Sequence, residues 1–485
     1  MADGPFDGQD PGMPDPEELR RMMEELLAGR TPSGISFDAS ALAKAAGLPS
    51  DPAFLRRLMT SLQQAANTPD AGIDWTLATD QAKATAAPGT QEISVQTRSE
   101  YEAALAVAGL WLSEVTSITE LTEPTRLVTR TEWIGQTMPV WSQISAPVAT
   151  SIAQALTRAM RDNAPEQLAG MLERALPMMQ GVAGALFAVQ LGQVVGQLSA
   201  EVVSGGDVGI PLLERAQSAL VPQNIDEFGA GLELPADQVR IALSVRELAH
   251  ARLFRHAKWL RLDLISAITA FADGVDIDME RIGEVASGFD PSNPEALREA
   301  LTDGSLIPEH SPAQRHALSR LETTLALIEG WVDVVTEQAS TRLPGAAAIA
   351  ETVRRRRATG GPAERALATL VGLELRPRRL REAAAMWRLV GEELGAAARD
   401  GLWAHPDLLP TSEDIDDPAA LVARLRGEGG GSAAEDDAFD QAIAELLRDD
   451  APRPIEDEDG RIEDPDDPEG PEGPAGPGGA GGPGL

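Results

Sequence analysis

The stretch SVRELAHARLFRHAKWLR, residues 244–261, decides the fold of this chain. It has the alanine- and leucine-rich composition of a packed helix, and the same composition recurs in most periodic segments of the 485 residues. Aromatic residues make up only 4% of the chain, and no strand alternation persists along it. We therefore predict an all-α fold, a multi-helix bundle between disordered acidic tails.

One pentapeptide within this stretch carries chemistry. Arg246-Glu247-Leu248-Ala249-His250 differs by one residue from His-Glu-x-x-His, a motif that binds catalytic zinc on a helix. Two histidines four residues apart lie about 40° from one another around a helix, so both rings can reach one metal ion. The glutamate between them acts as general base on the metal-bound water. Here the glutamate and the second histidine are present, and Arg246 replaces the first.

Further candidates lie on a downstream helix and at the end of the motif helix. Glu329 lies in the apolar run LALIEGWVD, where a buried carboxylate requires a metal, an arginine or another hydrogen-bond donor. Glu322 and Asp333 share its helix stripe. His256 lies about 240° around the helix from the motif histidine and is a candidate only if the helix bends. Spacing alone leaves structural roles open, since Glu-x-x-His is frequent by chance in helical proteins.

Several blocks of the sequence together resemble the actinobacterial zincin-like metallopeptidase family. They are RELAHARLF, LETTLALIEGWVD, RRRRATGGPAERALATLVGLELRPRRLREAAAMW and RDGLWAHPDLLPTSEDIDDP. The resemblance covers about residues 90–420 and implies a zincin-like helical scaffold for a zinc-dependent metallopeptidase or hydrolase. Through it, Glu247 corresponds to the general base, and His250 and Glu329 correspond to metal ligands. A sister branch, linked to deazaflavin-coenzyme biosynthesis, is similar but keeps the complete His-Glu-x-x-His.

Arg246 separates two functional hypotheses. A guanidinium stays protonated and donates no lone pair to zinc, and His250 with Glu329 provides two ligands where catalytic zinc sites have three. In the first hypothesis Asp333, Glu322 or His316 completes the zinc site, and the chain is a metallopeptidase-like hydrolase. In the second, Arg246 replaces the metal by pairing with Glu247 or Glu329. The chain is then an inactive zincin-fold scaffold that binds a peptide or protein partner.

Charge and composition restrict the partners and the location. The net charge is −35, with 18 acids against 3 bases in residues 428–485 and 8 against 2 in residues 1–25. So acidic a chain repels nucleic acid and anionic membrane surfaces. The chain has no cysteine, which excludes disulfides and thiolate chemistry, and its N-terminus lacks the apolar core of a signal peptide. We expect a cytoplasmic protein.

The organisation along the chain follows from composition and helix breakers. We predict a disordered N-terminal tail with a short helix (1–35), an N-terminal helical region (36–175), a zincin-like core carrying both motif helices (176–345), a C-terminal helical region (346–426) and a disordered acidic Pro/Gly tail (427–485). Ser311 and Pro312 predict the start of the helix that carries Glu329. The patterns near 73–75 and 92–95 also allow short strands.

Two further segments need an interpretation. Residues 178–203 are nearly free of charge, but their glutamines form a polar stripe, and Gly192, Gly196 and Ala200 form a stripe of small residues. This pattern favours a buried bundle helix over a membrane span. The four arginines 354–357 are interpreted as a solvated helix face or a cap for carboxylates rather than a phosphate site.

Overall fold

A computed structural model describes the protein over residues 73–163, 169–213, 217–274, 310–358, 366, 368 and 379–427. The chain divides into two units, Met1–Val422 and Ala423–Leu485. In the second unit the described residues are 423–427, which complete a helix and end in a turn. The predicted tails lie outside the described residues, and the five-region division of the chain stays a prediction.

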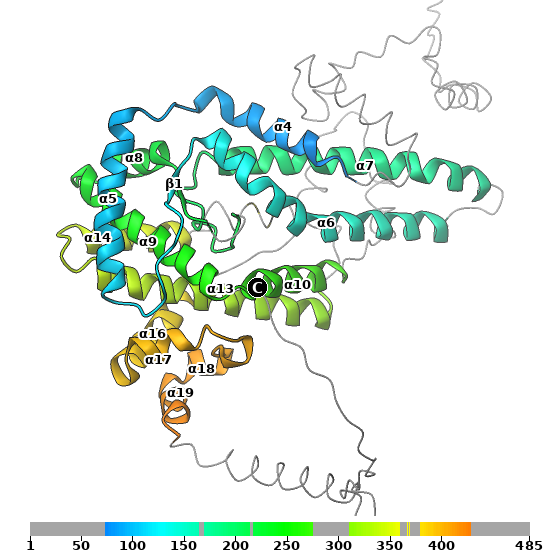
Figure 1. Ribbon diagram of the computed structural model, residues 1–485. Coiled ribbons are helices and arrows are strands. Elements are labelled where there is room, and N and C mark those ends of the chain that lie inside the picture. Colours follow the sequence, from blue (N-terminus) through cyan, green and yellow to red (C-terminus); the bar gives the residue numbers. More distant parts are fainter. Residues whose placement is uncertain are drawn as a thin grey trace, which may run out of the picture. The chain divides into compact units, whose positions relative to one another are not determined.

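Helices dominate the described part of the chain (Figure 1). The α-helices are α4 (Trp75–Ala86), α5 (Val95–Ser113), α6 (Arg130–Asn163), α7 (Ala169–Leu198), α8 (Pro222–Ala230), α9 (Ala236–His256), α10 (Leu260–Ala272), α13 (Pro312–Ala339), α14 (Ala346–Ala358), α16 (Leu380–Leu394), α17 (Ala396–Gly401), α18 (Ser412–Asp416) and α19 (Pro418–Leu425). Two 3₁₀ helices are η1 (Ala87–Gly89) and η4 (Pro406–Leu408). The two short strands are β1 (Arg126–Leu127) and β2 (Ala219–Leu220), and the all-α prediction is confirmed.

The two motif helices pack against each other at the centre of the first unit. Helix α13 packs against α9, α10 and α16, and α9 also packs against α5 (Figure 1). Helix α13 begins as predicted: the Ser311 side chain accepts from the backbone N–H of Gln314, and the Gln314 side chain accepts from that of Ser311. This capping box fixes the start of α13, and therefore fixes how far along the helix Glu329 lies.

The apolar segment around residues 178–203 forms most of α7, which packs closely against α4. A Cβ atom on Gly192 would lie 2.4 Å from the Ala78 carbonyl oxygen, and one on Gly196 would lie 2.8 Å from that of Ala82. The small-residue stripe therefore allows the two backbones to approach. Among the described helices, none combines the length and apolar composition that crossing a bilayer requires.

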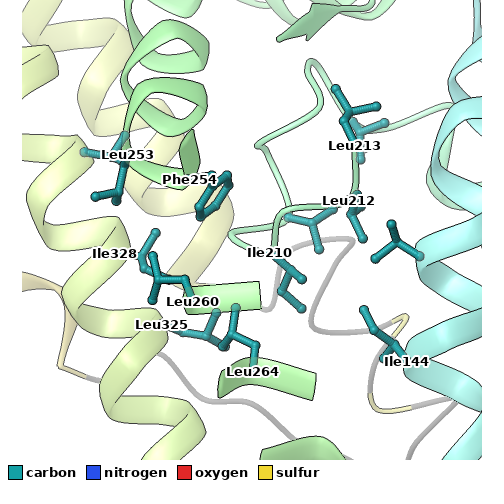
Figure 2. Packing of buried hydrophobic residues seen from close by; sticks show 14 of the residues in the cluster. Ile144, Ile210, Leu212, Leu213, Leu253, Phe254, Leu260, Leu264, Leu325 and Ile328 are labelled. Carbon is teal, nitrogen blue, oxygen red and sulfur yellow. The ribbon is translucent and has the colours of Figure 1, made fainter. Parts of the chain in front are cut away.

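The connection between α7 and α8 runs through the core instead of over the surface. Strand β2 pairs in parallel with β1, and residues 203–205 lie antiparallel to β2, with the Gly205 N–H donating to the Ala219 carbonyl at 2.8 Å. We call residues 203–213 the core segment. Figure 2 shows Ile210 and Leu212 of this segment lying between Ile144 of α6 and the side chains of α10 and α13.

The strands allowed near 73–75 and 92–95 are wrong, and helix caps explain why. The Asp74 side chain accepts from the N–H groups of Thr76 and Leu77, which starts α4 at Trp75. The Ser94 hydroxyl accepts from the Thr97 N–H and starts α5 at Val95. Local side-chain acceptors at these two positions outweigh the weak strand pattern.

Candidate functional site

Helix α9 carries the motif into the interior. Its residues from Ala242 to Phe254 are buried, and the exposed fractions are 7% for Arg246, 1% for Glu247 and 0% for His250. Glu329 of α13 is 2% exposed. The packing of α9 on α13 brings Arg246 and His250 to Glu329, an approach that the sequence alone does not predict.

Glu329 is the centre of a cluster of positively charged and polar groups, which we call the Glu329 cluster. Arg246 donates from Nη2 to one carboxylate oxygen. The other oxygen lies 3.1 Å from His250 Nε2 and 2.9 Å from Arg357 Nη1. Burial alone would raise the pKa of Glu329, but Arg357, Arg246 and His250 bring it well below its usual value. Glu329 is therefore an anion held by two guanidinium groups from different helices.

His250 is held at both ring nitrogens. Nδ1 lies 3.1 Å from the Arg246 carbonyl oxygen, and Nε2 faces Glu329. Burial lowers the pKa of His250; the Glu329 carboxylate opposes this effect, and the guanidinium groups of Arg246 and Arg357 reinforce it. A neutral ring carries a single N–H, on Nδ1 or on Nε2, and therefore donates either to the Arg246 carbonyl or to the Glu329 carboxylate.

Glu247 belongs to a separate set of hydrogen bonds. One of its oxygens accepts from the Gly206 N–H at 2.8 Å, and the other from the Ala219 N–H at 2.9 Å. Burial raises the pKa of Glu247 to about 7, and the hydrogen bonds from Ser204, Ala219, Gly206 and Ser218 limit that rise. The carboxylate fastens the core segment and β2 to α9.

Glycines of the core segment lie directly against the motif residues. A Cβ on Gly206 would lie 2.5 Å from His250 Cβ, and one on Gly209 would lie 2.9 Å from a Glu329 oxygen. Gly209 also has a φ of 77°, in the left-handed region that favours glycine. The backbone of the core segment therefore fills the space next to the motif side chains.

The other predicted residues lie around the cluster or apart from it. Asp333 is buried. One of its oxygens accepts hydrogen bonds from Arg354 Nε at 3.0 Å and from Arg354 Nη2 at 2.9 Å. Glu322 is half-buried on α13, and His256 is exposed at the end of α9. The carboxylate-cap interpretation of the four arginines is met by Arg354 and Arg357, but the sequence did not reveal that Arg357 reaches Glu329.

Comparisons with known proteins follow this geometry. The sequence model of the family described as "Zincin-like metallopeptidase" matches residues 73–422. The chain belongs to this family. A crystal structure from Chloroflexus aurantiacus, described as that of "a putative hydrolase with a novel fold", is similar to this zincin-like chain at 21% identity and a TM-score of 0.51, covering 74% of this chain and 100% of that one. That likeness concerns the fold alone. A search of curated proteins finds no match.

The residues of this zincin-like chain do not fit a zinc ion. His250 Nε2 and the nearest Glu329 oxygen are 3.1 Å apart, close to the separation of about 3.4 Å expected for two ligands of one tetrahedral zinc. However, both Glu329 oxygens already pair with guanidinium groups. A dication about 4 Å from one guanidinium would be repelled by about 8 kcal/mol at an effective dielectric constant of about 20. Within the described residues, no group of three or more His, Cys, Asp or Glu side chains could hold a metal.

Proposed function

We propose that this zincin-like chain does not hydrolyse peptides, and that its helical core is a scaffold for a peptide or protein partner. The observation that carries the proposal is the engagement of Glu247. A general base must face the attacking water, but both Glu247 oxygens accept backbone N–H groups and the side chain is 1% exposed. Glu247 is therefore committed to holding the core segment. The cytoplasmic location expected from the sequence stays a prediction within this proposal.

A small pocket lies beside Glu247. Its free volume is about 10 Å³, room for about one water molecule, and its walls include Pro211, Leu212, Leu213 and Phe254. Mostly apolar walls are typical of sites that accept a ligand side chain. A partner's side chain would enter this pocket only after its walls moved apart.

The competing function is the family's zinc-dependent hydrolysis. One observation favours it: His250 Nε2 and Glu329 approach each other at 3.1 Å, as two ligands of one metal would. Under this function, Arg246 and Arg357 would have to leave Glu329 before a metal could bind. The two functions therefore differ in whether added zinc produces hydrolysis that depends on Glu247.

Hydrolysis of fluorescent casein and of a mixed peptide library, with and without added zinc, tests the proposal. We expect the wild-type protein and Glu247→Gln to show equal, background hydrolysis. Glu382→Gln, which changes an exposed acid on α16, is the control. Zinc-stimulated hydrolysis that is present in the wild type and in Glu382→Gln but lost in Glu247→Gln would overturn the proposal.

A further inference from the structure

The Glu329 cluster brings cations from two helices to one acid. Two guanidinium groups, from α9 and α14, pair with one buried carboxylate from α13. Asp207 of the core segment is the next acid, and its carboxylate lies 3.8 Å from Arg357 Nη2. Since Arg357 has this second acid beside it, the cation whose position requires an explanation is the second one.

The second cation is Arg246, and its bonding is incomplete. An arginine that pairs with a carboxylate in the most favourable way donates two parallel hydrogen bonds. Arg246 donates to Glu329 from Nη2, while its buried Nε has no hydrogen-bond partner among the residues that the structure describes. Burial lowers the pKa of Arg246, and Glu329 opposes this effect. The side chain is therefore not arranged as an optimal ion pair.

The position of Arg246 explains this arrangement. It lies four residues before His250, so both side chains leave α9 on one face, about 40° apart. Both side chains contact the same carboxylate of α13. A metal ligated by residues at these three positions would lie between α9 and α13, where the Arg246 guanidinium now contacts Glu329.

We propose that the Arg246 guanidinium is an internal, non-dissociating replacement for the metal ion of this fold. It supplies the positive charge that joins α9 to Glu329, and Arg357 joins α14 to the same carboxylate. A bound metal can be removed by a chelator or by acid, whereas a guanidinium stays attached and protonated. The assembly of α9, α13 and α14 is therefore independent of metal. This inference deepens the proposed non-hydrolytic function and rests on it.

Thermal unfolding of the full chain tests the replacement, with EDTA or with zinc added. We expect the wild type to melt at the same temperature in both, and to purify without stoichiometric zinc. Arg246→Met should lower the melting temperature by about 5 °C, because it removes one of two cations from a buried carboxylate. Arg246→Lys should recover part of that loss, since it restores the charge. A wild type that loses stability in EDTA, or an Arg246→Lys as unstable as Arg246→Met, would overturn the inference.

A matched control separates the cation from ordinary packing. Arg252 is also a buried arginine of α9, but it donates to the Ser113 hydroxyl and the Gly109 carbonyl. Arg252→Met should destabilise the chain equally with and without zinc. By contrast, Arg246→His should bind zinc at least about tenfold more tightly than the wild type and melt higher with zinc than with EDTA. Equal zinc affinity of Arg246→His and the wild type would count against the inference. Hydrolysis by the wild type would instead overturn the proposed function.

Discussion

Two buried ion clusters contact α13, and they differ in how completely they are bonded. Asp400 of α17 accepts from Trp331 Nε1 at 2.9 Å, from Arg399 Nε at 2.8 Å, and from the Thr116 hydroxyl and the Ser117 N–H, both at 2.7 Å. Arg399 also donates to the Gln338 side chain and the Val115 carbonyl. One cation thus meets one anion, and neither residue has an unpartnered buried side-chain atom.

The Glu329 cluster has the opposite character. Two guanidinium groups share one carboxylate, and Arg246 Nε is left without a partner although it is buried. Both clusters are buried, although the arginines around Glu329 are 7–8% exposed and Arg399 is 1% exposed. The difference fits the proposal that Arg399 and Asp400 form a structural pair, whereas Arg246 stands in place of another cation.

The largest effect should come from removing the anion at the centre of the Glu329 cluster. Glu329→Gln would remove the carboxylate that both Arg246 and Arg357 contact, and we expect a loss of about 5 kcal/mol in the free energy of unfolding. Equilibrium unfolding in guanidinium chloride measures it, with Glu322→Gln as the control at about 0.5 kcal/mol or less. A loss no larger than that of the control would show that the cluster contributes nothing to stability.

A somewhat smaller loss should follow from breaking the balanced cluster. Asp400→Asn would turn an amide N–H₂ toward groups that now donate, and would leave Arg399 buried without its anion. We expect about 3–4 kcal/mol in the same measurement. If Asp400→Asn lowered the free energy of unfolding more than Glu329→Gln does, the charge of the second guanidinium beside Glu329 would have to be balanced by another acid.

The sequence predicted the elements of the Glu329 cluster better than its contacts. Helical composition, the Ser311 cap and the Glu-x-x-His spacing indicated α9 and α13, because these signals are local, whereas a site shared by the two helices was implied only by the family resemblance. The pairing of Arg246 was left open between Glu247 and Glu329, and the packing of α9 on α13 decided for Glu329.

The contacts that the sequence missed are long-range. Arg357 was recognised as a carboxylate cap without its partner, since nothing in a run of four arginines tells which one faces inward. The core segment is rich in glycine, but its approach to His250 and that of Gly206 to Glu247, 41 residues away, depend on long-range packing. Nothing in the spacing of Glu247 indicated that backbone N–H groups would occupy it.

The pH dependence of stability separates Glu247 from the ion clusters. The pKa of Glu247 is about 7 in the folded chain against an ordinary 4.5, so an unfolded chain loses this proton first as pH rises. The free energy of unfolding should therefore fall by up to about 3 kcal/mol between pH 4.5 and 7 and change little above pH 7. Glu329, whose pKa is lowered, acts in the opposite sense, and its contribution is lost as pH falls below about 4.5. Glu247→Gln should remove the slope between pH 4.5 and 7; an unchanged slope would assign it to other groups.

The smallest effect should come from a third ion pair, which joins the same two helices as Glu329 and Arg357. Arg354 of α14 pairs with Asp333 of α13, but its side chain is one-quarter exposed, so water can replace part of what the guanidinium donates. Arg354→Gln should cost about 1 kcal/mol or less, and Arg357→Gln clearly more, because Arg357 reaches a carboxylate that is 2% exposed. Urea unfolding of the two variants side by side measures the difference. Equal losses would mean that exposure does not determine how much each α13–α14 ion pair contributes to stability. Arg357 would then stabilise the chain no more than the partly exposed Arg354 does.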